Sequence, residues 1–213
     1  MKAYVVTLNN IPESIEAAER AVASAKMHGL YAFFWPGVWR DDAQYEMAVE
    51  GLKKGTFDET WSNTDAALGN FVAQFRIWQE IAHGDPGIIL EHDSVVVAPI
   101  PQLDGHGDII TLAKPSFGKL RQPANPGFYP LFSSGDKIPG AHGYYLTPTG
   151  AATLVNMAKR KGAIPVDKFI CPQRFHITEY WPWPIEAHDT FTTIQKQKGC
   201  LSKHNYGPEY KIL

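Results

Sequence analysis

The 213-residue sequence has few cysteines, no cluster of basic residues and no long apolar run. Cys171 and Cys200 are too few for a disulfide framework, so a reducing cytoplasm is the expected compartment. The 20 basic and 22 acidic side chains give a formal net charge of -2, which disfavours nucleic-acid and membrane-surface binding. No apolar stretch reaches the length of a membrane span, and residues 1–8 resemble a first strand rather than a signal peptide.

Several familiar catalytic and nucleotide-binding motifs are also missing. No Gly-x-Gly-x-x-Gly follows the first predicted strand, and neither a Walker sequence nor a Gly-x-Ser-x-Gly elbow occurs. His-x-x-x-His and Cys-x-x-Cys spacings, which are typical of zinc sites, do not occur either. These absences argue against dinucleotide binding, P-loop chemistry, serine hydrolysis and a zinc centre.

Apolar periodicity predicts an α/β fold in which helices flank a mostly parallel central sheet, within a single domain over residues 1–213. A strand-helix-strand opening implies a parallel pair with a right-handed crossover. Proline-rich residues 114–139 are too long for a plain connection and are predicted to be a binding loop or a mobile lid. Residues 180–184, which proline interrupts, are predicted to be an edge strand or a loop. Strands are expected at 2–8, 31–35, 88–90, 108–112 and 143–146, and helices at 12–28, 41–52, from 64 towards the turn at 84–87, and at 148–161.

The clearest functional signal is an apolar strand that ends on two acids. Residues 88–90 predict a strand buried on both faces, and Glu91, His92 and Asp93 follow at its carboxyl end, where open α/β sheets bind ligands. In an extended segment Glu91 and Asp93 share one face, and His92 points the other way. Carboxylates beside a core need compensation, and Mg²⁺ or Mn²⁺, which accept carboxylate and phosphate oxygens, would supply it. The alternative is a solvated turn after the strand.

Seven segments, in order over most of the chain, match the pattern of one protein family: Val5–Leu8, Gly69 with Arg76–Trp78, Ile89–Asp93, Asp108–Ile110, Gly140–Leu146 with Gly150–Ala151, Pro165–Asp167, and Thr192–Ile194. In these segments the sequence resembles glycosyltransferase family 25, which includes bacterial lipopolysaccharide galactosyltransferases and collagen galactosyltransferase domains. The sequence departs from the family pattern at His92, which replaces an acid, at Ser14, which replaces an arginine, and at Ala73 and Gln74, which replace a Ser-His pair.

The resemblance implies a GT-A-like fold and an inverting, metal-dependent glycosyltransferase. Such an enzyme moves a hexose such as galactose from a UDP-sugar to an acceptor hydroxyl on a glycan or lipopolysaccharide. Inversion by a single displacement needs a general base, for which Asp167 is the candidate. Asp167 as a helix N-cap or turn residue is the alternative. Trp181 and Trp183 either stack on sugar rings or pack in the core.

The resemblance also implies which residues bind the ligands. Mn²⁺ or Mg²⁺ is expected on Asp93, with Glu91 assisting and with His188, preferred over His176, as a late histidine ligand. The residues expected to contact the nucleotide-sugar donor are Thr7, Leu8, Asn9, Glu91 and His142.

The departures from the family pattern favour a second hypothesis from another functional class. In this hypothesis the protein is a non-catalytic relative that binds a nucleotide-sugar or a glycan. A nucleotide-sugar hydrolase, in which water replaces the acceptor, is a third interpretation.

Overall fold

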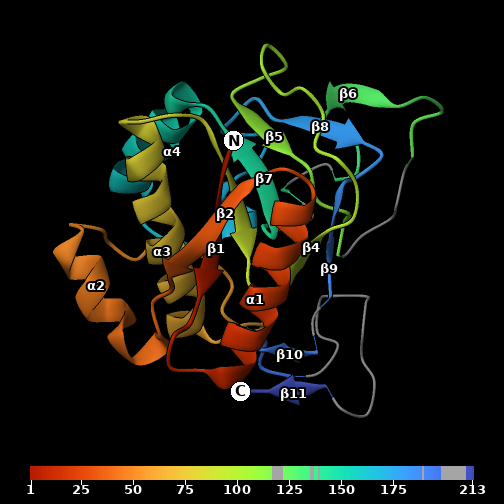
Figure 1. Ribbon diagram of the computed structural model, residues 1–213. Coiled ribbons are helices and arrows are strands. Elements are labelled where there is room, and N and C mark those ends of the chain that lie inside the picture. The colour runs from red at the N-terminus through yellow and green to blue at the C-terminus, as the bar shows by residue number, and fades with distance from the viewer. Residues whose placement is uncertain (117–121, 135–136, 139, 189, 198–209) are drawn as a thin grey trace.

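The central feature of the structure is a seven-stranded sheet with the strand order β2-β1-β3-β7-β5-β8-β6 (Figure 1). The structure, a computed structural model, describes residues 1–116, 122–134, 137–138, 140–188, 190–197 and 210–213. Five strands run in one direction, and β6 (Gly127–Pro130) and β7 (Gly143–Leu146) run in the other. The five are β1 (Lys2–Thr7), β2 (Tyr31–Pro36), β3 (Gly87–Glu91), β5 (Ile109–Thr111) and β8 (Thr178–Trp181). The predicted α/β class with a mostly parallel sheet is confirmed.

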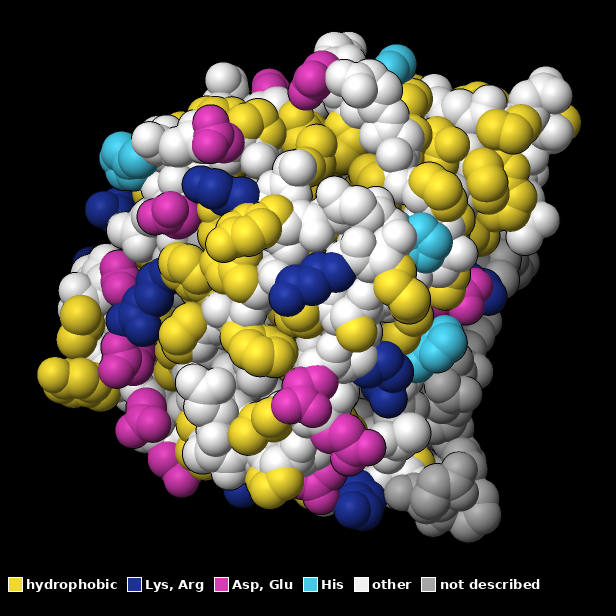
Figure 2. Space-filling view, viewed as in Figure 1, with side chains coloured by type: hydrophobic (Ala, Val, Ile, Leu, Met, Phe, Trp, Pro, Cys, Tyr) yellow, Lys and Arg dark blue, Asp and Glu magenta, His cyan; other side chains and the backbone are white. Residues whose placement is uncertain are grey.

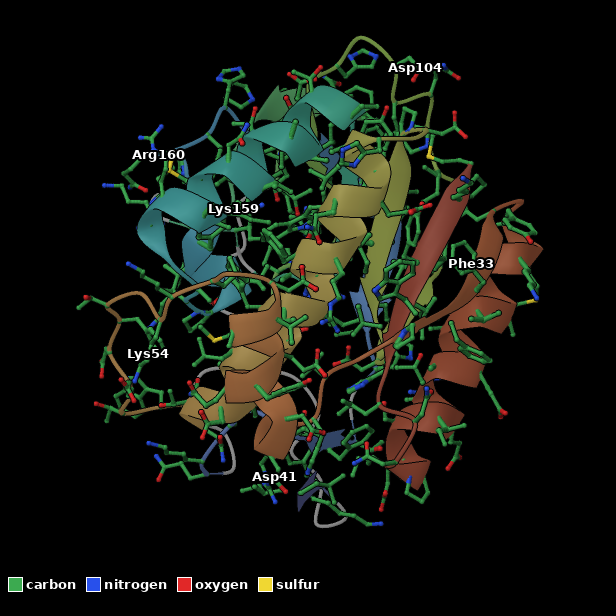
Figure 3. All side chains as sticks on the ribbon, turned by 90° about the vertical axis from the view of Figure 1, so that its left-hand side faces the viewer. Phe33, Asp41, Lys54, Asp104, Lys159 and Arg160 are labelled. Carbon is green, nitrogen blue, oxygen red and sulfur yellow. The ribbon has the colours of Figure 1, made fainter. Side chains whose placement is uncertain are left out.

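Helices cover both faces of this sheet. α1 (Pro12–Met27) packs on one face, while α3 (Thr64–Ala82) and α4 (Pro148–Lys161) pack on the other (Figure 3). The short helix η1 (Arg40–Asp42) and α2 (Ala43–Val49) lie against α3. This layered arrangement is consistent with a GT-A-like fold.

The strands at the centre of the sheet contribute to both cores. Because side chains alternate along a strand, Val5 of β1 packs in the α1 core, while Tyr4 packs in the α3 core. Ile88, Ile89 and Leu90 of β3 are fully buried, as the sequence predicts. Burial of each such side chain contributes about 1.5–3 kcal/mol. β3 is therefore a fixed support for the residues at its carboxyl end.

Two sequence predictions for the second half of the chain are wrong in part. Residues 114–139 are not one loop, because β6 lies within them and pairs antiparallel with β8. Tyr180 and Trp181 do not form an edge or a loop, because they end β8, which lies between β5 and β6. Pro182 comes just after the strand, where it removes no ladder hydrogen bond. Residues 117–121, 135–136 and 139 lie outside the described part of the chain.

Aromatic side chains gather on the edge strand β6 and the neighbouring strand β8. The rings of His106 and Phe128 stack with their centroids 3.7 Å apart, and Tyr180 lies 4.9 Å from Phe128. Figure 2 shows hydrophobic side chains grouped over β6 and β8, at the upper right of that face. Trp183 is buried, and its indole nitrogen donates to Glu179 Oε1 at 2.8 Å. These contacts favour the core-packing role for Trp183.

Two small sheets lie outside the main sheet, one packed beside α1 and the other near the start of α1. β4 (Ser94–Val96) pairs antiparallel with β9 (Ile185–Ala187), and β10 (Phe191–Thr192) pairs parallel with β11 (Lys211–Ile212). Figure 1 shows β10 and β11 below the main sheet, near the start of α1. Segments from the end of the chain are thereby brought beside the acidic end of β3.

Two structural observations bear on the sequence predictions about the cysteines and about membrane spans. Cys171 is buried and carries a free thiol, whereas Cys200 lies outside the described residues. Within the part of the chain that the structure describes, no helix is both long and apolar enough to cross a bilayer.

Candidate active site

A pocket of about 220 Å³ lies where the carboxyl ends of β1, β2 and β3 meet the amino end of β7. β7 is antiparallel to β3, with Leu90 opposite Gly143, so the residue before β7 lies beside the residue that ends β3. The Glu91 backbone N–H accordingly donates to the His142 carbonyl, with an N···O distance of 3.4 Å. The charged and polar residues of the lining are Arg40, Ser62, Asn70, Glu91, His92, Asp93, Ser116, His142, Asp167, Thr192, Thr193, Gln195 and Tyr210.

Five residues that the sequence assigns to the site line this pocket: Leu8, Glu91, Asp93, His142 and Asp167. Three others lie outside the lining: Thr7, Asn9 and His188. The Thr7 hydroxyl donates to the Val5 carbonyl at 2.9 Å, within its own strand. Asn9 is exposed, as is His176, the second histidine candidate.

His188 approaches Asp93 through its backbone and not through its ring. The His188 N–H donates to the Asp93 carbonyl at 2.8 Å. The imidazole Nε2 lies 3.5 Å from Glu186 Oε2, and the side chain is 46% exposed. Glu186 also pairs with Lys114 at 2.8 Å. The ring of His188 therefore lies at the surface beside Glu186, at the side of the pocket.

The acidic segment turns sooner than the sequence pattern predicts. Glu91 ends β3, and His92 and Asp93 form a turn before β4. All three residues line the pocket. The Glu91 carboxylate accepts hydrogen bonds from α3, whereas the His92 ring contacts Ser14 of α1, and these two helices cover opposite faces of the sheet. The prediction that His92 points away from Glu91 is therefore confirmed.

Helix α3 holds the carboxylate of Glu91. Asn70 Nδ2 donates to Glu91 Oε1 at 2.9 Å, and Gln74 Nε2 donates to the same oxygen at 3.3 Å. Asn70 and Gln74 are four residues apart, so they share one face of the helix. The helix itself begins at a capping residue, Asn63, whose side chain accepts from the Ala66 N–H. Gln74, one of the departures from the family pattern, thus contacts the acidic signature directly.

Two further departures from that pattern contact each other. His92 Nδ1 lies 2.9 Å from the Ser14 hydroxyl, which also accepts from the Leu8 N–H at 2.9 Å. The His92 ring packs against Phe191 with centroids 5.0 Å apart. Ser14 is fully buried in the first turn of α1. His92 is therefore fitted to its surroundings by a hydrogen bond and an aromatic contact.

Asp167 lies in the short helix α5 (Val166–Phe169) and lines the same pocket as the residues from β3 and β7. Pro165, not Asp167, occupies the N-cap position, so the N-cap alternative is wrong. Asp167 Oδ1 accepts from the Lys168 N–H at 2.9 Å. Burial raises the pKa of the Asp167 carboxyl, and the positive charges of Lys137 and Lys168 oppose this only in part. A carboxylate with a raised pKa is better matched to proton abstraction.

Sequence reasoning missed several lining residues. Arg40 and Trp39 follow β2, and the Arg40 guanidinium lies 4.6 Å from the centroid of the Trp39 ring. Their position after a parallel strand is a signal that could have identified them. Tyr210 has no comparable local signal, because it reaches the pocket only through the pairing of β10 with β11.

Two carboxylates of the pocket have the chemistry that a divalent cation with hard oxygen ligands requires. Glu91 and Asp93 line the same pocket, and Mg²⁺ commonly uses one or two carboxylates together with substrate phosphates. Over the ranges that the structure describes, no group of three or more His, Cys, Asp or Glu side chains is arranged to hold a metal ion.

Comparison with known proteins identifies no family for this chain. No protein-family model and no curated protein matches the sequence, so membership of glycosyltransferase family 25 stays a prediction. Among solved structures, the chain is similar to the crystal structure of an active-site mutant of LgtC, with a TM-score of 0.43 and 8% sequence identity. The match covers 88% of this chain and 87% of that chain. At this level of similarity it carries no information about function.

Proposed function

We propose that the protein is an inverting glycosyltransferase that transfers a hexose, such as galactose, from a UDP-sugar to a hydroxyl of a glycan or lipopolysaccharide. The observation that carries this proposal is the convergence of Glu91, Asp93, His142 and Asp167 on one pocket. The four residues come from the end of β3, the entry to β7 and helix α5. A sheet edge that gathers carboxylates from separate elements suits a substrate that is both charged and polyhydroxylated.

The two acids at the end of β3 form the donor side of the proposed site. Asp93 and Glu91 would hold Mn²⁺ or Mg²⁺, and the bound ion supplies positive charge for the leaving diphosphate. Asn70 and Gln74 orient the Glu91 carboxylate. His142 and Leu8 line the same pocket and are proposed to contact the donor.

Asp167 is the proposed general base on the acceptor side. As the acceptor oxygen bonds to the anomeric carbon, the hydroxyl proton passes to the Asp167 carboxylate. The bond between that carbon and the diphosphate oxygen breaks, and its electron pair leaves with UDP. The attack from the side opposite the leaving group inverts the anomeric centre. The raised pKa of Asp167 favours the proton transfer.

Release of UDP from UDP-galactose in the presence of Mn²⁺ and a panel of glycan acceptors tests this proposal. Asp93→Asn and Asp167→Asn are each expected to lower turnover by about 100-fold or more, since each removes a charge used in the reaction. Asp85→Asn is the matched control, because Asp85 is 80% exposed and lies before β3. Undiminished turnover in Asp93→Asn or Asp167→Asn would overturn the role of that residue.

The hydrogen bonds that Glu91 and His92 make within the protein favour one alternative, a binding protein without catalysis. Glu91 accepts from two amides, and His92 replaces an acid of the family pattern. Thermal-shift measurements with UDP-galactose, with and without Mn²⁺, distinguish the two functions. Stabilisation that is independent of metal, together with no UDP release, supports the binding protein. UDP release without any acceptor identifies a hydrolase.

A further inference from the structure

A chain of hydrogen bonds runs from the interior of the protein to the Glu91 carboxylate. The indole nitrogen of Trp78 donates to the Tyr144 hydroxyl at 2.8 Å, and that hydroxyl donates to Gln74 Oε1 at 2.5 Å. Gln74 Nε2 then donates to Glu91 Oε1 at 3.3 Å. Trp78, Tyr144 and Gln74 are fully buried, whereas Glu91 is half-buried at the pocket. This series of hydrogen bonds thus links two residues of α3 and one residue of β7 to the proposed metal site.

The direction of this chain follows from the chemistry of its first member. An indole N–H can only donate, so the Tyr144 oxygen accepts from Trp78 and must send its own proton elsewhere. The acceptor within reach is Gln74 Oε1, and this fixes the amide of Gln74 with its NH₂ group towards Glu91. Burial raises the pKa of Tyr144 well above its usual range, so the hydroxyl keeps its proton.

We propose that Gln74 is a positioning residue for the Glu91 carboxylate, and that Tyr144 and Trp78 determine which way the Gln74 amide faces. The use made of the positioned carboxylate, cation binding, rests on the proposed function. Gln74 Nε2 donates both to Glu91 Oε1 and to Asn70 Oδ1, and Asn70 Nδ2 in turn donates to Glu91. These successive hydrogen bonds strengthen one another in a site of low dielectric. Without the Tyr144 hydroxyl, the amide can turn and place its oxygen against the carboxylate. That arrangement would repel Glu91 from its present position.

Two neighbouring tyrosines of β7 give a matched pair of variants. Tyr144→Phe removes the hydroxyl that faces Gln74. Tyr145→Phe removes a hydroxyl from the next residue, which is equally buried but belongs to the core on the other face and contacts Asp104 Oδ1 at 3.4 Å. Both variants keep the aromatic ring, so both retain most of the packing. Gln74→Met removes the amide itself while keeping a side chain of similar length.

The first measurement is the affinity for Mn²⁺ in the presence of UDP, followed through the electron paramagnetic resonance signal of free Mn²⁺. Removal of a residue that orients a metal ligand typically lowers metal affinity by about 10–100-fold, and this is expected for Tyr144→Phe and Gln74→Met. Tyr145→Phe should keep the affinity of the unaltered protein. An unchanged affinity in Tyr144→Phe, or an equal loss in both tyrosine variants, overturns the proposal.

The second measurement uses the side-chain amide NMR signals of isotope-labelled glutamine, with the Gln74 signals identified by their loss in Gln74→Met. In Tyr144→Phe these signals are expected to shift and to exchange faster with solvent, whereas Tyr145→Phe should leave them unchanged. Identical Gln74 signals in Tyr144→Phe and the unaltered protein overturn the positioning role. If the unaltered protein does not bind Mn²⁺ with UDP, the metal part of the proposed function fails, and the NMR result alone decides whether Tyr144 orients Gln74.

Discussion

Substitution of Gly69 by alanine is expected to displace one wall of the pocket. A Cβ atom at Gly69 would lie 2.4 Å from the Val38 carbonyl oxygen, whereas real Cβ atoms essentially never approach closer than 3.0 Å. Helix α3 and Val38 must therefore separate by roughly 0.6 Å, the difference between these distances. Val38 and the next two residues, Trp39 and Arg40, line the pocket, so the displacement reaches the proposed site.

Two opposing effects set the size of the stability change at Gly69. Alanine is favoured over glycine in a helix interior by about 1 kcal/mol. Overpacking of a filled core typically costs about 1–3 kcal/mol. The clash is with backbone, which cannot rotate away as a side chain can, so the cost should lie in the upper part of that range. The expected net loss in the free energy of unfolding is about 1–2 kcal/mol, measured by urea denaturation.

Gly150 provides a control with the same close approach to a backbone carbonyl oxygen. A Cβ atom at Gly150, in helix α4, would lie 2.4 Å from the Asp108 carbonyl oxygen, and neither residue lines the pocket. Gly150→Ala should therefore lose a similar free energy of unfolding, while the stabilisation by UDP-galactose in a thermal-shift assay stays unchanged. Gly69→Ala should lose both free energy of unfolding and the stabilisation by UDP-galactose. A Gly69→Ala protein as stable as the unaltered one, with unchanged UDP-galactose binding, would refute the reasoning, because Val38 would then move at no cost.

Three further variants test other parts of the structure. Asp167→Asn should become more stable relative to the unaltered protein as pH rises through the carboxylate range, because burial raises the pKa of the native Asp167 carboxyl and so penalises its ionisation. Urea denaturation at several pH values measures the difference in the free energy of unfolding between the two proteins. A difference that does not change with pH would contradict the prediction. Glu179→Gln should lower the free energy of unfolding by about 1–3 kcal/mol, because this fully buried carboxylate accepts hydrogen bonds from Trp183 Nε1 and from two backbone N–H groups. Tryptophan fluorescence during urea denaturation measures this loss. Ser14→Ala should lower the free energy of unfolding by about 1–2 kcal/mol, since it removes a buried hydroxyl that is hydrogen-bonded to His92 Nδ1. An unchanged midpoint of urea denaturation would argue against that hydrogen bond.

The sequence predicted the first half of the fold better than the second. β1, α1 and β2 follow one another with clear apolar periodicity and short turns, so local pattern was enough to find them. β6 lacks such a pattern within a proline-rich stretch, and it is a strand because β8 offers it a partner. The same holds for β10 and β11, whose pairing joins residues 191–192 to residues 211–212. Strand pairing between distant segments leaves little trace in a local window.

The candidate site divides in a similar way. Glu91 and Asp93 were found because two acids at the end of an apolar strand are unusual and because the topology of α/β sheets places ligands there. Asp167 and His142 were assigned through the family resemblance, and the structure places both in the same pocket as the two acids. His188 was assigned by its position in the sequence alone, and its ring lies beside Glu186 instead.

By itself, the sequence determined that this chain forms an α/β fold and that one buried strand places two carboxylates at its carboxyl end. Hydrophobic periodicity and turn residues act locally, so they can be read along the chain. Only the tertiary structure decided what surrounds those carboxylates. The amide of Gln74 on Glu91, the hydroxyl of Ser14 on His92, and Asp167 in the same pocket all depend on long-range packing. The residues that differ from the family pattern thereby acquire contacts that no local reading of the sequence contains.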